Sequence, residues 1–355
     1  MNAIAINEDK LHALVGMAVG DMSASNGGVM ISIGHKLGLY KAMAGQGPIS
    51  SADLAKRAGC AERYVREWLN CNAAGNYVAY HPATQTYELT PEQTLLLADD
   101  TSPVFVPNAW EVAASLWHDE AKTIEAFRTG KGVAWGDHHE RLYCGVAAFF
   151  RNGYAAHLVP DWLPALEGVV PKLEKGARVA DIGCGHGHSA IIMAKAFPHA
   201  RFWGFDTHAG SIATARENAK KAGVADRVQF DVAQAGAYPE TGFDLICFFD
   251  ALHDMGHPDR ALQQAAKALA KDGTLMLVEP FANDKVEDNL NPIGRMYYAG
   301  STALCCAHAI SENGSHVLGA QAGEGRLAEL AKANGFSQFR RATATPFNLI
   351  LEARL

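Results

Sequence analysis

A carboxylate followed by glycines at every second position is the first feature of this sequence that could do chemistry. It lies in residues 179–190, VADIGCGHGHSA, where Asp181 precedes Gly183, Gly185 and Gly187. The apolar residues before the acid predict a buried strand, and the residues after the glycines predict a helix. Glycines at such a turn permit unusual backbone angles and let a ligand approach the backbone. The spacing is not the G-x-G-x-x-G of dinucleotide sites, and the absence of a following Gly-Lys-Ser/Thr disfavours a triphosphate.

Further carboxylates follow the next apolar segments. Asp206 lies in FWGFDTH, nineteen residues after Gly187, where a carboxylate can accept hydrogen bonds from two ribose hydroxyls. Asp231 in QFDVAQA is placed for an adenine edge, and Asp250 follows a fourth apolar segment. Because ligands of open parallel sheets bind beyond the carboxyl ends of the strands, we expect these acids to surround one ligand. A phosphate-free adenosine with an amino-acid tail fits acceptors of this kind.

Alternating strands and helices must position these acids. From about residue 168 the candidate strands are ARVADI, RFWGFDT, RVQFDV, FDLICFFDA and GTLMLVEP, with helical segments between them. Near-continuous apolar strands of this kind predict a parallel sheet covered by helices on both faces. Two more strand-like segments, FSQFRRAT and FNLILEARL, end the sequence and predict a terminal hairpin.

The segment from about residue 8 to residue 98 has a different pattern. ISSADLAKRAGC begins with Ser50 and Ser51, either of which can cap a helix. AERYVREWLNCNAAGN predicts a second helix, with Tyr64 and Trp68 exposed on its apolar face. YVAYHPATQTYELT alternates around a turn and predicts a β-hairpin. Helix, turn, helix and a two-stranded wing together predict a winged helix.

The middle of the chain is helical and rich in tryptophan and histidine. We expect three domains: a winged-helix dimerisation domain over 1–98, a helical linker over 99–167 that contributes to a substrate pocket, and a catalytic domain over 168–355. Adjacent side chains on a helix diverge by about 100°. We therefore expect His138 and His139 to be surface residues rather than ligands of a metal.

Composition narrows the class of protein. The chain has 355 residues, a formal net charge of −7, 48% hydrophobic residues and 19% charged residues. This charge argues against a general affinity for nucleic acids or anionic membranes. The seven cysteines lack paired metal-binding spacing, which favours a reduced, cytoplasmic compartment. We expect neither a secretory leader nor a membrane span, because the start lacks basic residues before its apolar part and no apolar run approaches 18 residues.

Taken in order, the segments VADIGCGHG, FWGFDTH, DRVQFDVAQA, FDLICFFDALHDMGHP and GTLMLVEP resemble the motifs of class I S-adenosylmethionine-dependent methyltransferases. This resemblance covers residues 168–355. Residues 10–98 resemble the winged-helix dimerisation domain of small-molecule O-methyltransferases and of a related bacterial group. The resemblance implies a Rossmann-like, mostly parallel seven-stranded sheet with an antiparallel terminal hairpin, preceded by an all-helical, winged-helix domain. It also implies S-adenosyl-L-methionine as methyl donor, S-adenosyl-L-homocysteine as product, and a homodimer formed through the N-terminal domain.

The same resemblance assigns the cofactor residues. Asp181 and the glycine backbone would face the methionine part, Asp206 would hold the ribose, and Asp231 with Val232 would flank adenine. Phe249 and Asp250 would lie beside the sulfonium. The full set of predicted cofactor-binding residues is Asp181, Gly183, Cys184, Gly185, Gly187, Asp206, Thr207, Asp231, Val232, Phe249 and Asp250.

The segment ALHDMGHP resembles the His-Asp run that follows the fourth strand in small-molecule O-methyltransferases, where the histidine is the base. Carried over, His253 is the predicted general base and Asp254 its catalytic neighbour, although another acid could orient the imidazole. Methyl transfer is an in-line displacement that depends on proximity, and a hydroxyl acceptor gains from a positioned base. A histidine here could also simply line the cofactor pocket, and the Trp that follows His-Asp in plant enzymes is absent.

The acceptor pocket is expected from segments outside the sheet. The predicted substrate residues are Tyr154, Trp162, Arg295, Tyr298 and His308, with Tyr297, Cys305, Cys306 and His316 as further lining. Each of these side chains could equally serve packing. The sequence does not name the acceptor, so N- or C-methylation of a small molecule remains open.

A DNA-binding regulator is the alternative from another class. The segment 36–98 carries six basic and five acidic residues, a net charge of +1. A DNA-reading domain should instead show a basic stripe. The N/D-P-P-Y/F signature of amino-group methylation on bases is also absent. We therefore expect a small-molecule substrate rather than a nucleic acid.

Overall fold

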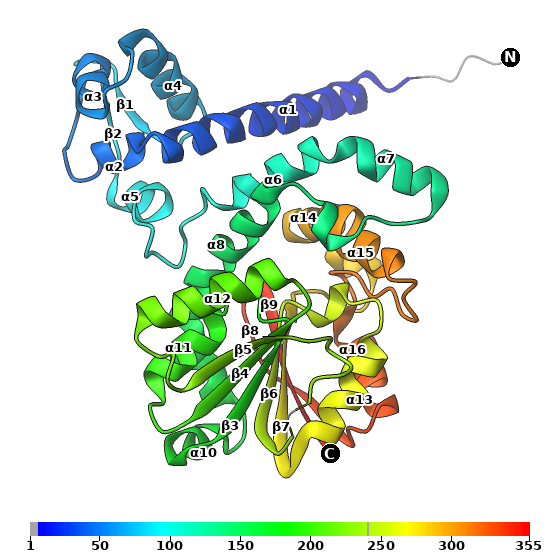
Figure 1. Ribbon diagram of the computed structural model, residues 1–355. Coiled ribbons are helices and arrows are strands. Elements are labelled where there is room, and N and C mark those ends of the chain that lie inside the picture. The colour runs from blue at the N-terminus through cyan, green and yellow to red at the C-terminus, as the bar shows by residue number, and fades with distance from the viewer. Residues whose placement is uncertain (1–5, 240) are drawn as a thin grey trace, which may run out of the picture. The chain divides into compact units, whose positions relative to one another are not determined.

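The computed structural model of the protein describes residues 6–239 and 241–355 (Figure 1). The expectation about a leader rests partly on residues 1–5, which lie outside the described residues. The chain forms two compact units: Met1–Ala114 with Cys144–Asn152, and Ser115–Tyr143 with Gly153–Leu355. The middle segment 99–167 is thus divided between the two units rather than forming a linker of its own.

The first unit has the predicted winged-helix order. It contains α1 (Glu8–Lys36), α2 (Leu39–Met43), α3 (Ser51–Ala58), α4 (Glu62–Ala74), β1 (Ala79–His81), β2 (Thr86–Glu88) and α5 (Pro91–Leu97), and it shares α6 (Ala109–His118) and α8 (Glu140–His157) with the second unit. The Ser50 side chain caps α3 by accepting from the Asp53 N–H, and Gly59 ends that helix in the left-handed conformation. β1 and β2 pair antiparallel as the wing.

The two aromatic residues of α4 lie on different sides. Trp68 is buried, and its Nε1 donates a hydrogen bond of 2.8 Å to the Met30 carbonyl of α1. A Cβ at Gly34 of α1 would lie 2.4 Å from the Trp68 ring, so this glycine makes room for the indole. Tyr64, in contrast, is 82% exposed. The prediction that both side chains are exposed was therefore wrong for Trp68, because α1 covers it.

The second unit is built on one seven-stranded sheet, as predicted. Its strands are β3 (Arg178–Ile182), β4 (Arg201–Asp206), β5 (Val228–Val232), β6 (Phe243–Phe249), β7 (Leu269–Pro280), β8 (Gln338–Ala344) and β9 (Asn348–Arg354). The strand order is β5-β4-β3-β6-β7-β9-β8. β3 to β7 pair in parallel, whereas β9 is antiparallel to both of its neighbours. The order reverses between β3 and β6, so the carboxyl ends of these central strands form the expected ligand-binding edge.

Helices cover both faces of this sheet (Figure 1). α11 (His188–Ala196) and α12 (Ala209–Ala222) lie on one face, and α13 (Pro258–Ala268) and α16 (Gly323–Ala333) lie on the other. The core between them is apolar and includes Phe205, Phe243, Phe248, Leu262 and Leu275. The remaining helices are α7 (Glu120–Thr129), α9 (Leu163–Ala165), α10 (Val169–Lys175), α14 (Pro292–Gly300) and α15 (Cys306–Ser311).

Several short turns complete the unit near the strand ends. The 3-10 turns are η1 (Trp135–Asp137), η3 (Leu252–Asp254) and η4 (Val286–Asn289), and the π-helical turns are η2 (Leu158–Trp162) and η5 (Ser301–Cys305). π-helical turns are rare and often occur at functional sites. Within the described ranges, no helix combines the length and the apolar character needed to cross a membrane.

Candidate active site

The glycine loop connects β3 to α11 in left-handed backbone. Gly183, Gly185 and Gly187 have φ angles of 74°, 51° and 75°. A Cβ would lie 2.7 Å from the Ala251 side chain at Gly183 and 2.5 Å from Phe230 at Gly187, whereas at Gly185 it would meet no described atom within 4 Å. Packing and backbone angle thus require the outer two glycines, and the middle one borders open space. That space is where a ligand can approach the backbone.

Two carboxylates flank the loop. Asp206 at the end of β4 accepts hydrogen bonds from the Gly185 N–H (2.9 Å) and the His208 N–H (2.8 Å), so it braces the loop. Asp181 is buried and accepts from the Ser189 hydroxyl through Oδ2, while its Oδ1 has no hydrogen-bond partner among the described residues. Burial raises the pKa of Asp181 to about 7, against the opposing hydrogen bonds from Ser189 and the Ala190 backbone.

These groups fit S-adenosylmethionine. A buried carboxylate oxygen without a partner is a place for the positively charged amino group of a methionine tail. Asp206 keeps unused lone pairs on both oxygens, which can accept from ribose hydroxyls. Cys184 lies buried within the loop, and Thr207 is exposed directly after Asp206. The predicted methionine and ribose residues therefore come together in one place.

The predicted adenine residues lie at the end of the neighbouring strand. Val232 pairs with Asp206 in the β4–β5 register and is 54% exposed. The Asp231 carboxylate already accepts hydrogen bonds from Arg216 (3.1 Å) and Gln229 (2.5 Å). Of these two residues, Val232 presents the more open surface to a ring, and the role of Asp231 at adenine stays a prediction.

Asp250 links the end of β6 to two other elements. Its backbone is left-handed, with a φ of 48°. Its carboxylate accepts hydrogen bonds from the Tyr154 hydroxyl of α8 (2.7 Å) and the Asn348 amide of β9 (2.8 Å). Burial raises the pKa of Asp250 to about 7. Phe249 and Trp162 both pack against Tyr154, at ring-centroid distances of 5.4 and 5.8 Å. The structure thus brings four predicted cofactor and substrate residues into one buried cluster.

His253 forms a buried pair with Glu279. The imidazole Nδ1 lies 2.7 Å from Glu279 Oε2, and Glu279 Oε1 accepts a 3.1 Å hydrogen bond from the Leu252 N–H. Burial alone lowers the pKa of His253, but the Glu279 charge and the neighbouring Cys305 outweigh burial and raise that pKa well above its usual value. In the neutral ring, with Nδ1 as the donor to Glu279, Nε2 carries the lone pair that a base needs. The arrangement matches a positioned general base.

Sequence reasoning missed Glu279 as the orienting acid. It belongs to GTLMLVEP, a predicted strand and motif segment in which no residue is assigned a role, and it is 26 residues away from His253. Its signal was an acid at the carboxyl end of an apolar strand, next to the strand end that carries the histidine. Asp254, the predicted catalytic neighbour, is half-buried, and its pKa is raised to about 6 by burial. Asp254 does not hold the imidazole Nδ1, and a catalytic role for it stays a prediction.

The predicted substrate residues divide into two groups. Tyr154 bonds to Asp250 and packs against Trp162, whereas His308 Nδ1 accepts a hydrogen bond of 3.2 Å from the Trp135 N–H. Arg295 is exposed on α14, and Tyr298 is half-buried there. Among the further lining residues, Tyr297 donates to the Phe347 carbonyl at 2.7 Å, and Cys305 packs beside His253.

His138 and His139 differ from the prediction of surface residues. His138 is buried, and its Nδ1 lies 3.1 Å from the buried carboxylate of Asp119. The His139 N–H donates to the same carboxylate at 2.8 Å. Both histidines precede α8, with His139 as its N-cap residue. They do not lie within a helix, so the helical spacing argument did not apply.

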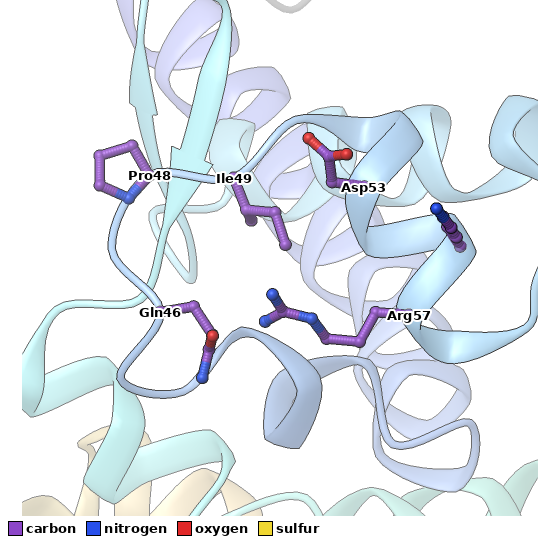
Figure 2. A pocket seen from close by; sticks show the side chains of 6 residues that line it. Gln46, Pro48, Ile49, Asp53 and Arg57 are labelled. Carbon is purple, nitrogen blue, oxygen red and sulfur yellow. The ribbon is translucent and has the colours of Figure 1, made fainter.

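A separate pocket lies in the winged-helix unit (Figure 2). Its lining residues are Gln46, Pro48, Ile49, Asp53, Lys56 and Arg57. Arg57 donates a 2.8 Å hydrogen bond to the Ala42 carbonyl, and all of these residues except Ile49 are exposed. The pocket is an open depression that contains none of the predicted site residues.

Comparison with known proteins places both parts of the chain. The family described as "Methyltransferase domain" matches residues 173–335. The family described as "Rv2258c-like winged HTH domain" matches residues 25–99. The prediction of a class I methyltransferase domain behind a winged helix is thereby confirmed.

Curated relatives share the methyltransferase part. The chain is 40% identical over 116 residues to 27-O-demethylrifamycin SV methyltransferase of Amycolatopsis mediterranei, covering 32% of this chain and 41% of that protein. It is 34% identical over 134 residues to trans-aconitate 2-methyltransferase of Paracidovorax citrulli, covering 34% of this chain and 50% of that protein. The chain thus spans half or less of the length of each of these relatives.

Solved structures share the whole fold. The mitomycin 7-O-methyltransferase MmcR superposes with a TM-score of 0.70 at 18% identity, over 98% of this chain and 100% of that one. Human N-acetylserotonin methyltransferase in complex with SAM gives 0.68 at 16% identity, over 99% of both chains. At these identities the likeness establishes the fold, including the helical N-terminal region and the seven-stranded sheet.

Proposed function

We propose that this protein transfers a methyl group from S-adenosylmethionine to an oxygen atom of a small molecule, with His253 as the general base. The observation that carries this proposal is the buried His253–Glu279 pair beside the glycine loop of a methyltransferase domain. The cofactor, when bound, supplies an electrophilic methyl group on a sulfonium. The enzyme then has to position the acceptor oxygen and remove its proton.

The chain's own residues divide this work. Asp181 Oδ1 and the Gly185 backbone would hold the amino-acid tail of the cofactor, and Asp206 would hold the ribose. His253 Nε2 would accept the proton of the acceptor hydroxyl, giving an imidazolium. Glu279 would stabilise this cation through Nδ1–H, because charge-assisted hydrogen bonds in a buried site are strong. The pair thus makes the acceptor oxygen nucleophilic as it meets the methyl group.

Names of similar proteins support an oxygen acceptor. Two of the similar proteins are a 27-O-demethylrifamycin SV methyltransferase and a fatty-acid O-methyltransferase of Mycolicibacterium smegmatis. MmcR is a mitomycin 7-O-methyltransferase with the same fold. N- or C-methylation would not need a base held in this way, so the buried pair favours oxygen over the two alternatives.

The surface of the winged helix argues against a DNA-binding regulator. Two arginines of α4 are engaged by acids on the same helix, Arg63 by Glu67 (2.6 Å) and Arg66 by Glu62 (2.7 Å). A helix that reads DNA needs cations available for phosphates. We therefore propose that no nucleic acid is the substrate, and a gel shift at low salt tests this directly.

A homodimer through the N-terminal unit is part of the proposal. The first half of α1 is exposed, with apolar side chains at Leu11, Leu14, Val15, Met17 and Val19. Contiguous exposed apolar surface marks an interaction site. Light scattering should give twice the chain mass for the natural protein and a monomer for Leu14→Glu; an unchanged mass for the variant would exclude this helix as the interface.

All seven cysteines are free thiols, which is consistent with the cytoplasm as the proposed location. Fractionation of the source cells with an antibody to the chain tests this location.

The experiment that tests the activity uses the full chain, S-adenosylmethionine with a labelled methyl group, and a panel of phenols, catechols and amines. The proposal expects label in an ether of at least one hydroxylated acceptor. Label only in amines would favour N-methylation, and failure of S-adenosylhomocysteine to bind in calorimetry would remove the proposed cofactor.

A further inference from the structure

Asp250 has no part in the proposed proton transfer, yet two elements distant in the chain converge on its carboxylate. Its Oδ2 accepts a hydrogen bond from the Tyr154 hydroxyl of α8, and its Oδ1 accepts one from the Asn348 amide of β9. The left-handed backbone at residue 250 is uncommon outside glycine, with aspartate and asparagine among the exceptions. With both oxygens engaged, the orientation of this carboxylate is fixed.

Asp250 lies between the glycine loop and the proposed base. Its neighbour Ala251 packs against the loop, since a Cβ at Gly183 would lie 2.7 Å from the Ala251 side chain. His253 follows in the turn η3, and its charge lowers the pKa of Asp250, so the two residues are within electrostatic reach. In the proposed reaction, the methyl group passes from a cofactor held at the loop to an oxygen held at the base. The predicted position of Asp250 beside the sulfonium agrees with this placement.

The Asp250 side chain keeps capacity for a ligand besides its two donors. Asp250 is half-buried, whereas Tyr154 and Asn348 are buried. Each carboxylate oxygen has two lone pairs, and the hydrogen bonds to Tyr154 and Asn348 use one on each. Burial and the Glu279 charge raise the pKa of Asp250 to about 7, whereas these two hydrogen bonds act in the opposite direction and favour the ionised form.

The methyl donor and its product differ in charge at one atom. The sulfur of S-adenosylmethionine is a cation. When the methyl group leaves, the sulfur keeps the electron pair of the broken bond, and S-adenosylhomocysteine has a neutral thioether. A carboxylate in a partly buried site attracts the cation and has no such attraction to the thioether. A fixed carboxylate beside the sulfur therefore distinguishes the two molecules.

We propose that Asp250 determines specificity for the cationic methyl donor over its neutral product, and that Tyr154 and Asn348 are positioning residues that hold the Asp250 carboxylate in place. The inference rests on the proposed function and goes beyond it, because it assigns to these residues the exchange of product for fresh donor. The preference lets S-adenosylmethionine displace S-adenosylhomocysteine after each turnover and so limits inhibition by the product.

The test is calorimetry on the full chain without an acceptor, with S-adenosylmethionine and S-adenosylhomocysteine as the two probes. Asp250→Asn removes the charge, while asparagine tolerates the left-handed backbone and its amide can still bond to Tyr154 and Asn348. The variant should bind S-adenosylmethionine about tenfold more weakly and should change its affinity for S-adenosylhomocysteine less than about twofold. A merely structural role would weaken the binding of both probes alike.

Two further variants sharpen the test. Tyr154→Phe keeps the ring and removes the donor, so it should lower the preference for S-adenosylmethionine by about threefold. Asp244→Asn is the matched control, because it removes a carboxylate at the other end of β6, where Asp244 accepts from the Arg178 N–H at 2.8 Å. This control should keep the natural preference.

A second readout in the natural protein covers an Asp250→Asn variant that does not fold. The groups that act on the pKa of Asp250 are Tyr154, Glu279, His253 and Asn348. With ¹³C-labelled aspartate carboxyls, S-adenosylmethionine should lower the pKa of one carboxyl that S-adenosylhomocysteine leaves unchanged, because the sulfonium stabilises the ionised form.

Equal weakening of both probes in Asp250→Asn, an unchanged preference in that variant, or the same carboxyl pKa values with both probes would overturn the role of Asp250. An unchanged preference in Tyr154→Phe would overturn the positioning role of Tyr154. The proposed function fails by different results: neither probe binds, or no hydroxylated acceptor is methylated.

Discussion

The second unit holds two buried imidazole–carboxylate pairs, Glu279–His253 and Asp119–His138, and in each the Nδ1 atom faces the acid, at 2.7 and 3.1 Å. Burial lowers the pKa of both imidazoles. At His253 the Glu279 charge helps to outweigh burial, and the pKa rises. At His138 the Asp119 charge does not outweigh burial, and the pKa falls. The same local pair thus goes with a raised imidazole pKa in one place and a lowered imidazole pKa in the other.

The number of donors around each acid contributes to the difference, together with Cys305, which also raises the pKa of His253. Besides His253, Glu279 accepts only one hydrogen bond within the described residues, from the Leu252 N–H. Asp119 is shared by Lys122 (2.7 Å), the His139 N–H and the His118 ring as well as by His138. A carboxylate whose charge is already compensated stabilises an imidazolium less. The surroundings of each pair therefore contribute to the pKa of its imidazole.

The largest expected effect is at the reacting atom. His253→Ala should reduce turnover by about 10²- to 10⁴-fold, the usual contribution of a general base. Binding of S-adenosylhomocysteine should change little, because His253 is not among the predicted cofactor-binding residues. Single-turnover kinetics and calorimetry on the same preparation measure both quantities. Equal loss of turnover and cofactor binding would mean that His253 lines the pocket and is not the base.

Glu279→Gln should have the next largest effect on turnover, a loss of about 10- to 100-fold. The glutamine amide can keep a hydrogen bond to the ring but supplies no negative charge for the imidazolium. Steady-state kinetics with the best acceptor from the panel measure the loss. Glu324→Gln is a control, because it removes an acid paired with Arg341 at the surface. A wild-type turnover for Glu279→Gln would show that orientation alone suffices.

Asp119→Asn should act on stability rather than on chemistry. Nearby donors hold the pKa of Asp119 well below its usual range, so the pair adds stability above the ordinary aspartate pKa and loses it as the pH falls. We expect a loss of about 1–2 kcal/mol in unfolding free energy near pH 7 that shrinks below about pH 4. Urea denaturation near pH 7 and below about pH 4 measures the unfolding free energy of the variant and of the natural protein. A loss of the same size at both pH values would contradict the electrostatic explanation.

The smallest expected effect is at Lys122. Its charge lowers the pKa of His138, and its ammonium shares the Asp119 carboxylate. Lys122→Met should therefore raise the pKa of His138 by less than about one unit. Titration of the ¹⁵N-histidine signals follows the change. A fall in this pKa would show that the donors around Asp119 do not distinguish the two pairs.

The contrast also shows what the sequence could reveal. The glycine loop and the acids at 181 and 206 were predictable, because a strand, a turn and a helix adjoin in the chain and parallel strands end at one edge. The Glu279–His253 pair depends on the neighbouring strands β6 and β7, so no spacing within the sequence encodes it. The burial of His138 depends on Asp119 from the α6–α7 junction, and helical periodicity could not indicate a contact between two loops.

In the winged helix, too, local signals were predictable and tertiary contacts were not. Its order of helices and strands followed from caps, turns and alternation, which are local signals. The burial of Trp68 required Gly34, a residue on α1, whereas Trp68 lies on α4. Which apolar face is covered is decided by tertiary packing, and the pattern of one helix does not contain that information.

The pH dependence of the single-turnover rate of methyl transfer, compared between the natural protein and Glu279→Gln, tests the central claim most directly. The base must be neutral to accept a proton, so the rate should rise with pH through the raised pKa of His253. Without the Glu279 charge, burial should dominate, and the rise should move to lower pH. A rate that rises at the same pH in both proteins, or that does not depend on pH, would contradict a base held by Glu279.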